Sequence, residues 1–353
     1  SSVQIINFKS KYNKFLMLKN NKYHFSFLLW LITLIILVVS IIIIGGLTRL
    51  TESGLSITEW ELFSGILPPL NEEKWNEYFS YYKEIPQFIL LNSSMTLSEF
   101  KIIFWWEYIH RAIARLIGIF FLLPLIFFVA KKVLFKRDIL NLSFIFLLIL
   151  IQGTIGWFMV KSGLVDEVTV SHYRLAIHLT IAFIILSSIY WFFLNFISNS
   201  NKNLLTINSD SLLIKLLLFT ILLQIFCGAL VSGLDAAKVY QTWPLMNGYY
   251  APENLIIHLN DPGFVQFIHR NLAYLIFFIS LYLAFTIYRF KNTKIYKIFY
   301  CYFTFILIQV LLGILVLISG FNIYIASAHQ ISSIFLVLSI LTMLHFSLKS
   351  SKN

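Results

Sequence analysis

Hydrophobic residues are gathered along the chain into long blocks, and most polar residues lie between them. Eight blocks are long enough to cross a bilayer, which takes about 20 apolar residues in a helix. They cover residues 25–48, 102–130, 139–160, 173–196, 211–233, 265–288, 295–318 and 324–347. The alternation expected of barrel strands is absent, so each block predicts a membrane-spanning helix.

Composition agrees with this pattern. Of the 353 residues, 59% are hydrophobic and only 12% are charged, about half the charged fraction of an ordinary soluble domain. The two cysteines, Cys227 and Cys301, fall inside predicted spans, which excludes a disulfide scaffold. The first block follows a basic stretch without a small-residue cleavage site, so it is expected to be a span and not a signal peptide. The sequence therefore predicts an all-α polytopic membrane protein.

Charge predicts the orientation. The N-terminus, the loops 131–138, 197–215 and 289–297, and the C-terminus together hold 17 of the 27 Lys and Arg residues but two of the 16 acids. By the positive-inside rule both termini are expected to be cytoplasmic. A Lys-, Asn- and Ile-rich bias without an arginine-rich transit segment favours a bacterial inner membrane over a mitochondrial one. The net charge of +11 thus reflects topology and indicates no nucleic-acid partner.

Two substantial loops, 49–101 and 234–264, are expected on the outer side. Both are rich in aromatic residues, which suits a lid at the membrane interface better than a free soluble domain. These residues are Trp60, Trp75, Tyr78, Tyr81 and Tyr82 in the first loop and Tyr240, Trp243, Tyr249 and Tyr250 in the second.

The chain is an internal repeat. Glu107–Ala114 matches Gln266–Ala273, Leu150–Gly156 matches Leu307–Gly313, and Arg174–His178 matches Ile325–His329. The repeat predicts two pseudo-symmetric, parallel four-helix bundles. The expected parts are a cytoplasmic segment 1–24, a first bundle 25–196, a cytoplasmic linker 197–210, a second bundle 211–347 and a tail 348–353.

Four histidines lie at matching depths near the outer ends of the even-numbered spans: His110, His178, His269 and His329. The repeat pairs the first with the third and the second with the fourth, so two histidines are expected to face each other within each bundle. A buried hydrogen bond between helices is the alternative for any single one. His24 and His345 are expected to reach interfacial water at the cytoplasmic ends of their spans.

Two facing imidazoles lack the further ligands of a tetrahedral zinc site. They suit an octahedral iron whose four equatorial ligands come from a porphyrin. Arg111, Arg115 and Arg270 can pair with haem propionates or extend to lipid headgroups. Because all four histidines lie near one face, electron transfer across the membrane is disfavoured.

The two halves differ at Glu107, whose counterpart is Gln266. Glu107 precedes His110 by three residues and shares its helix face. It can relay protons or orient the histidine; pairing with Arg111 or Lys101 is the alternative. The difference predicts chemistry in the first half and a resident haem in the second.

Six segments carry a family resemblance: Gly45–Ser56, Glu107–Arg111, Tyr173–His178, Leu234–Ala236, Thr242–Gly248 and Phe267–Arg270. Together they resemble the haem A synthase family in its alphaproteobacterial and mitochondrial form, over nearly the whole chain. Some members carry a cysteine pair in an outer loop. This sequence lacks it, which puts a thiol–disulfide role in doubt.

The resemblance implies that the chain oxidises the C8 methyl of haem O to a formyl group by successive hydroxylations, supplying haem A for cytochrome oxidase. It assigns His110 and His178 to the haem being converted and His269 and His329 to haem b. It also implies a functional role for Glu107. The implied partner is haem O synthase, as substrate donor. The lipid bilayer and an unidentified electron donor are also expected partners, and a homo-oligomer stays open.

Two other classes of protein share some of these features. A dihaem b-type cytochrome that transfers electrons at the outer face predicts unmodified protohaem and equivalent halves. A carrier built on parallel repeats predicts polar groups near mid-membrane. No Asp or Glu lies there in the sequence, which disfavours the carrier.

Overall fold

The computed structural model describes residues 22–59, 66–164, 168–206, 209–255, 257–289 and 293–348. The regular elements within these ranges are all helices, and the ranges contain no β-strand. Eight helices within them are long and apolar enough to cross a membrane. They are α3 (His24–Leu50), α6 (Leu97–Ala130), α7 (Lys136–Gly163), α8 (His172–Ile197), α9 (Ser209–Gly233), α10 (Pro262–Arg289), α11 (Thr293–Ile318) and α12 (Ile323–Ser347). Each matches one predicted span to within a few residues, which confirms the all-α polytopic fold.

The largest difference is at the start of α6, which begins five residues before the apolar block. A capping box explains it, since Thr96 Oγ1 accepts a hydrogen bond from the Glu99 N–H and the Glu99 carboxylate accepts one from the Thr96 N–H at 2.8 Å. Such a cap satisfies backbone donors that a helix end leaves unpaired. The early start gives α6 an outer extension against which the first loop packs.

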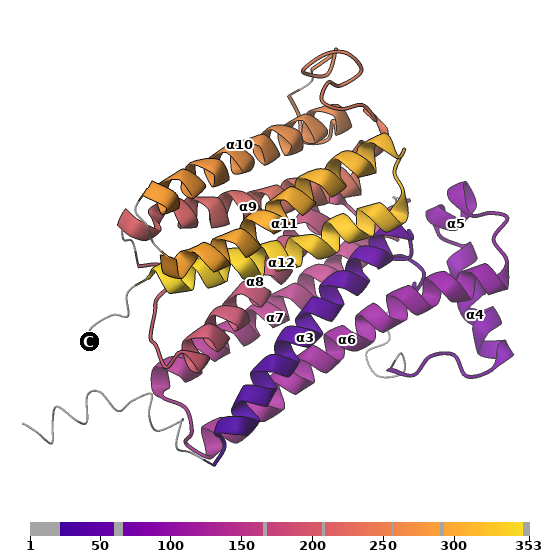
Figure 1. Ribbon diagram of the computed structural model, residues 1–353. Coiled ribbons are helices and arrows are strands. Elements are labelled where there is room, and N and C mark those ends of the chain that lie inside the picture. The colour runs from indigo at the N-terminus through magenta and orange to yellow at the C-terminus, as the bar shows by residue number, and fades with distance from the viewer. Residues whose placement is uncertain are drawn as a thin grey trace, which may run out of the picture.

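The spanning helices pack in two groups (Figure 1). In the first group α3 contacts α6 and α8, and α7 contacts α6 and α8; in the second, α9 contacts α10 and α12, and α11 contacts α10 and α12. Contacts of α8 with α9 and of α3 with α12 join the groups. Because α8 also packs extensively against α9, the division into halves 25–196 and 211–347 and the symmetry between them stay predictions.

The first outer loop folds over the extension of α6. Its helices are α4 (Glu72–Lys83), which contacts α6, and α5 (Pro86–Leu91). Tyr82 is fully buried, and its hydroxyl donates to Gln87 Oε1 at 3.0 Å and accepts from Asn92 at 2.8 Å. Burial raises the pKa of Tyr82. Trp75, Phe79, Phe100 and Phe104 pack around it in one apolar cluster. The predicted aromatic residue Trp60 lies outside the described residues.

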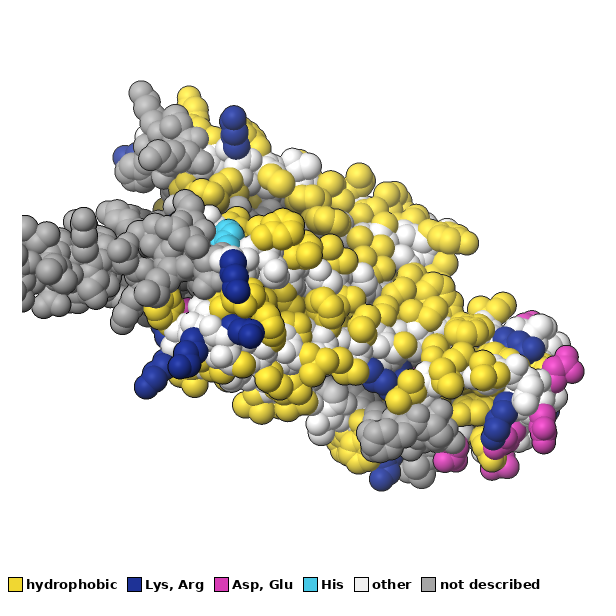
Figure 2. Space-filling view, turned by 90° about the horizontal axis from the view of Figure 1, so that it is seen from below, with side chains coloured by type: hydrophobic (Ala, Val, Ile, Leu, Met, Phe, Trp, Pro, Cys, Tyr) yellow, Lys and Arg dark blue, Asp and Glu magenta, His cyan; other side chains and the backbone are white. Residues whose placement is uncertain are grey.

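Side-chain chemistry divides the surface into zones. Figure 2 shows a broad hydrophobic band, with acidic side chains gathered at the end that carries the first outer loop and Lys and Arg at both ends. The first residues of α3 and the last residues of α12 lie at the end of the molecule opposite that loop (Figure 1). An even number of spans requires this, because it returns the chain to the side on which it started. Of the predicted cytoplasmic parts, residues 1–21, 207–208 and 349–353 lie outside the described residues.

His345 differs from its prediction. It was expected to reach interfacial water, but only 1% of it is exposed. Its Nε2 lies 3.2 Å from Asn195 Oδ1 and 3.3 Å from Ser200 Oγ. The linker after α8 folds back over the end of α12, where Lys202 Nζ donates to the His345 carbonyl at 2.6 Å. A segment that reads as polar in the sequence thus covers the histidine.

Candidate functional site

Each of the four candidate ligand histidines lies against a glycine of the preceding spanning helix. The pairs are Gly45 with His110, Gly156 with His178, Gly228 with His269, and Gly313 with His329. A Cβ built on Gly45 would lie 2.8 Å from Cε1 of His110, and the corresponding distances for the other pairs, in chain order, are 3.0, 3.0 and 3.3 Å. Because glycine has no side chain, each imidazole can approach the backbone of the neighbouring helix closely. A larger residue at the same position would occupy the space that the imidazole takes.

The histidine rings have unsatisfied nitrogens. The Nδ1 atoms of His110, His178, His269 and His329 are all buried, and none has a hydrogen-bond partner among the described residues. The helices that carry each predicted pair share both neighbours: α6 and α8 both contact α3 and α7, and α10 and α12 both contact α9 and α11. Buried polar atoms normally have partners. A porphyrin-bound iron would be held by the other ring nitrogen, Nε2, and Nδ1 would then carry the proton that helps to orient each ring.

Glutamines hold three of the four histidine segments. Gln152, Gln224 and Gln309 each donate from Nε2 to the backbone carbonyl of His178, His269 and His329 respectively, at 2.9, 3.0 and 2.9 Å. Each glutamine stands four residues before the glycine that faces the same histidine, so both lie on one helix face. The first span has Ile41 at this position. Sequence reasoning missed this role, although Gln-x-x-x-Gly recurs in spans three, five and seven.

Glu107 is buried and anchors the loop that follows α3. Only 2% of it is exposed. Its carboxylate accepts hydrogen bonds from Ser56 Oγ at 2.7 Å and from the Ile57 N–H at 2.9 Å, and it pairs with Arg111 at 2.5 Å. Arg111 also donates to the Ile57 carbonyl at 3.0 Å. Of the partners considered from the sequence, the structure gives Arg111, and it adds the loop 56–57.

The second half repeats this arrangement without the negative charge. Gln266 Nε2 donates to the carbonyls of Ala236, at 3.0 Å, and Tyr240, at 3.1 Å, in and after η2 (Ala236–Lys238). Arg270 donates to the Tyr240 carbonyl at 2.9 Å. The Nε and Nη1 atoms of Arg270 are buried without a hydrogen-bond partner in the described ranges. A buried guanidinium with free donors suits a carboxylate ligand such as a propionate.

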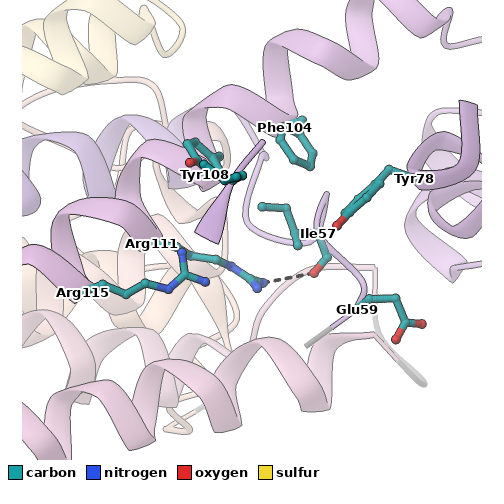
Figure 3. Close-up of a pocket in the computed structure, with 8 residues that line it drawn as sticks. Ile57, Glu59, Tyr78, Phe104, Tyr108, Arg111 and Arg115 are labelled. Atoms are coloured by element: carbon teal, nitrogen blue, oxygen red, sulfur yellow. Dashed lines mark hydrogen bonds between the residues drawn. The ribbon is translucent and has the colours of Figure 1, made fainter. Parts of the chain in front are cut away.

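Arg111 and Arg115 line a pocket at the outer end of α6 (Figure 3). Its other walls come from Ile57, Glu59, Leu67, Tyr78, Phe104 and Tyr108. In Figure 3 Arg111 extends to the Ile57 carbonyl and Arg115 lies beside it, one helical turn away. Arg111 is neutralised by Glu107, whereas Arg115 forms no ion pair with a described residue. The pocket therefore presents a cationic group to an anionic ligand.

Arg49 joins the two halves at their outer ends. Its Nη2 donates to the Ser232 carbonyl at 2.6 Å and lies 3.7 Å from the Asp235 carboxylate. Both partners lie at or just beyond the end of α9, whose free carbonyls favour a cation. Arg49 thus ties α3 to α9.

Within the described ranges, eight apolar helices that carry four glycine-backed histidines define a polytopic, all-α membrane protein. The chain belongs to the cytochrome oxidase assembly protein family, whose model matches residues 28–341.

Curated relatives agree over most of the chain. A protein of Pelagibacter ubique (strain HTCC1062) named heme A synthase is 46% identical over 322 residues, covering 88% of this chain and 93% of the relative. Heme A synthases of Rickettsia bellii (strain RML369-C) and Rhizobium rhizogenes (strain K84 / ATCC BAA-868) are each 42% identical; they cover 87% and 86% of this chain and 94% and 84% of their own lengths.

Proposed function

We infer that this protein is a haem A synthase, a membrane oxidoreductase that converts the C8 methyl of haem O to the formyl group of haem A. The observation that carries the inference is the 46% identity to a protein of that name over 88% of the chain. The four glycine-backed histidine sites give the inference a physical basis, because two haems require two pairs of axial ligands.

We propose that His110 and His178 bind haem O, the substrate, and that His269 and His329 bind haem b, a resident cofactor. All four rings lie against a glycine of the preceding spanning helix, and this shared setting supports both assignments. Bound haem iron supplies the redox chemistry, and the protein orients the ligands and keeps water away from them. Arg270, with buried free donors, fits a propionate of haem b. Arg111 and Arg115, which line the outer pocket, are the corresponding candidates for haem O.

Room for a hydrocarbon tail supports placing haem O in the first half. Haem O carries a farnesyl-derived tail that haem b lacks. A Cβ on Gly118 of α6 or Gly153 of α7 would meet no heavy atom within 4 Å. The repeat aligns these glycines with Phe277 and Val310, and Phe277 contacts Phe303 of α11 at 6.2 Å between ring centroids. Gly153 is exposed, so the space beside it opens onto the lipid. Beside Gly118, which is half-buried, the first half leaves open a position that a phenylalanine ring occupies in the second half.

Glu107 is proposed to position the outer loop over the first site. Its carboxylate accepts hydrogen bonds from Ser56, Ile57 and Arg111. The contact with Glu107 orients Arg111, which lines the outer pocket together with Arg115. A role in moving protons from the first site would use this same carboxylate, because the aligned residue of the second half, Gln266, cannot carry a proton in the same way.

The relatives and the charge pattern support placing the protein in a bacterial inner membrane with both termini cytoplasmic. Haem O, being farnesylated, is too apolar for the cytosol, so we propose direct supply from haem O synthase within the bilayer. Electrons are proposed to arrive from an unidentified donor.

Co-expression with a source of haem O tests the function. Pigments extracted from membranes should contain haem A or its hydroxymethyl precursor. Unchanged haem O beside intact, haem-loaded protein would contradict the enzymatic function. That result, with equal reduction of both haems, would favour the alternative of a dihaem b-type cytochrome.

A further inference from the structure

Gln330 reaches from the second group of helices into the first. It follows His329 directly in α12, and its Nε2 donates a 2.8 Å hydrogen bond to the carbonyl of Ile42 in α3, 288 residues away in the chain. A Cβ built on Gly46 would lie 1.6 Å from Gln330 Oε1. The amide therefore occupies space that exists only because residue 46 is glycine.

The same turn of α3 supports His110. Gly45 lies next to Gly46, and a Cβ on it would lie 2.8 Å from His110 Cε1. Ile42 stands three residues before Gly45, within one helical turn. The hydrogen bond from Gln330 thus holds the backbone segment on which the His110 ring rests. Gln330, which adjoins the candidate ligand His329, therefore holds the helix turn against which a second candidate ligand, His110, is packed.

The matching contact elsewhere in the chain is apolar. The repeat aligns Gln330 with Leu179, which follows His178, and Gly46 with Ala229, which follows Gly228. Ala229 is buried in an apolar cluster against which Leu179 packs. Packing between the groups is therefore achieved there without a polar side chain. An amide within a membrane must be hydrogen-bonded to offset its desolvation, so packing alone does not account for Gln330.

The first site also lacks a support that the other three histidine segments have. Ile41 stands where a glutamine would hold the His110 carbonyl. We propose that Gln330 is a positioning residue of the first histidine site, supplied by the second half of the chain. It holds the α3 turn at Ile42–Gly46, keeps the His110 ring in place, and couples the geometry of the first site to the helix that carries His329. As far as haem is concerned, this proposal rests on the proposed function.

Two variants test it in the full-length protein with protohaem bound at both sites. Gln330→Met keeps the side-chain length and removes the donor, and Gly46→Ala displaces the amide. Each should shift the absorbance and paramagnetic resonance signature of the first-site haem. Each should also speed the loss of that haem to a haem-free globin about fivefold, the equivalent of one net hydrogen bond. The signature of the second-site haem should stay unchanged.

Control variants show which spectroscopic signal belongs to the haem of which site. His110→Ala and His269→Ala identify the haem of the first and second site, and Leu179→Met makes a similar replacement at the aligned position. Leu179→Met should leave the first-site signature as in the unaltered protein. A wild-type first-site signature and transfer rate in Gln330→Met, or equal changes at both sites, would overturn the proposal.

A readout without haem separates this inference from the proposed function. In ligand-free protein, amide hydrogen exchange over residues 42–46 should be faster in Gln330→Met and Gly46→Ala than in the unaltered chain. Unchanged exchange would contradict the positioning role whatever the protein converts. Failure of the unaltered protein to convert haem O would contradict the proposed function alone.

Discussion

Gly45 and His110 are in direct contact between α3 and α6, at a distance that leaves no space for a side chain on residue 45. A Cβ there would lie 2.8 Å from His110 Cε1 and 3.2 Å from Nδ1. Real Cβ atoms do not approach so closely, so an alanine must move the imidazole. The glycine therefore sets the position of a candidate iron ligand from another helix.

Gly45→Ala should weaken haem binding at the first site by about tenfold, because the ring leaves its rotamer. The fold should be retained, since the imidazole is the group that moves. Haem titration of purified protein measures the affinity. Gly54→Ala is the control, because a Cβ there meets no heavy atom within 4 Å. Equal affinities for Gly45→Ala and Gly54→Ala would contradict the role of the contact.

Gly118→Phe should discriminate between two haems. The phenyl ring copies Phe277 and fills the space proposed for the farnesyl-derived tail, so haem O binding should fall roughly tenfold while protohaem binding persists. Spectral titration with each haem gives the two affinities. Leu116→Phe, at a residue 46% exposed on the same helix, controls for bulk. Parallel loss of both haems would mean that the open space is not a tail site.

Glu107→Ala should lower both conversion and stability. It leaves the partly buried Arg111 without its counter-ion and releases the loop 56–57. Breaking a fully buried pair typically costs about 3–5 kcal/mol, so the loss of stability should be at or below the lower end of that range. Glu107→Gln copies Gln266 and should recover much of the stability without restoring conversion. Thermal unfolding and the ratio of haem A to haem O measure the two effects. A fully stable Glu107→Ala protein would rule out the anchoring role.

His269→Ala should lose the resident haem and keep the first-site haem, because it removes one axial ligand of the second pair. His345→Ala is the matched control, a buried histidine hydrogen-bonded to Asn195 and Ser200. It should keep both haems and lose about 1–3 kcal/mol of stability, the cost of unsatisfied buried partners. A persistent second-site low-spin signal in His269→Ala would remove His269 from the ligand set.

The limits of sequence reasoning are visible at individual residues. Glu107 could be matched to Arg111 in advance because the two are four residues apart on one helix. Its bond to Ser56, 51 residues away, could not, because it depends on how the loop after α3 returns to α6. His345 was wrongly expected to meet water, since nothing local indicates that the linker covers it.

The sequence alone determined the eight spans, the repeat and the four histidines, because membrane insertion requires long apolar helices and duplication leaves matching motifs. Only the tertiary structure decided what each histidine touches. Glycine contacts, glutamine-to-carbonyl bonds and the Gln330–Ile42 link all join separate helices. Such contacts depend on the rotation and depth at which helices pack, and those are set by side-chain fit between helices, which no local pattern along the chain records.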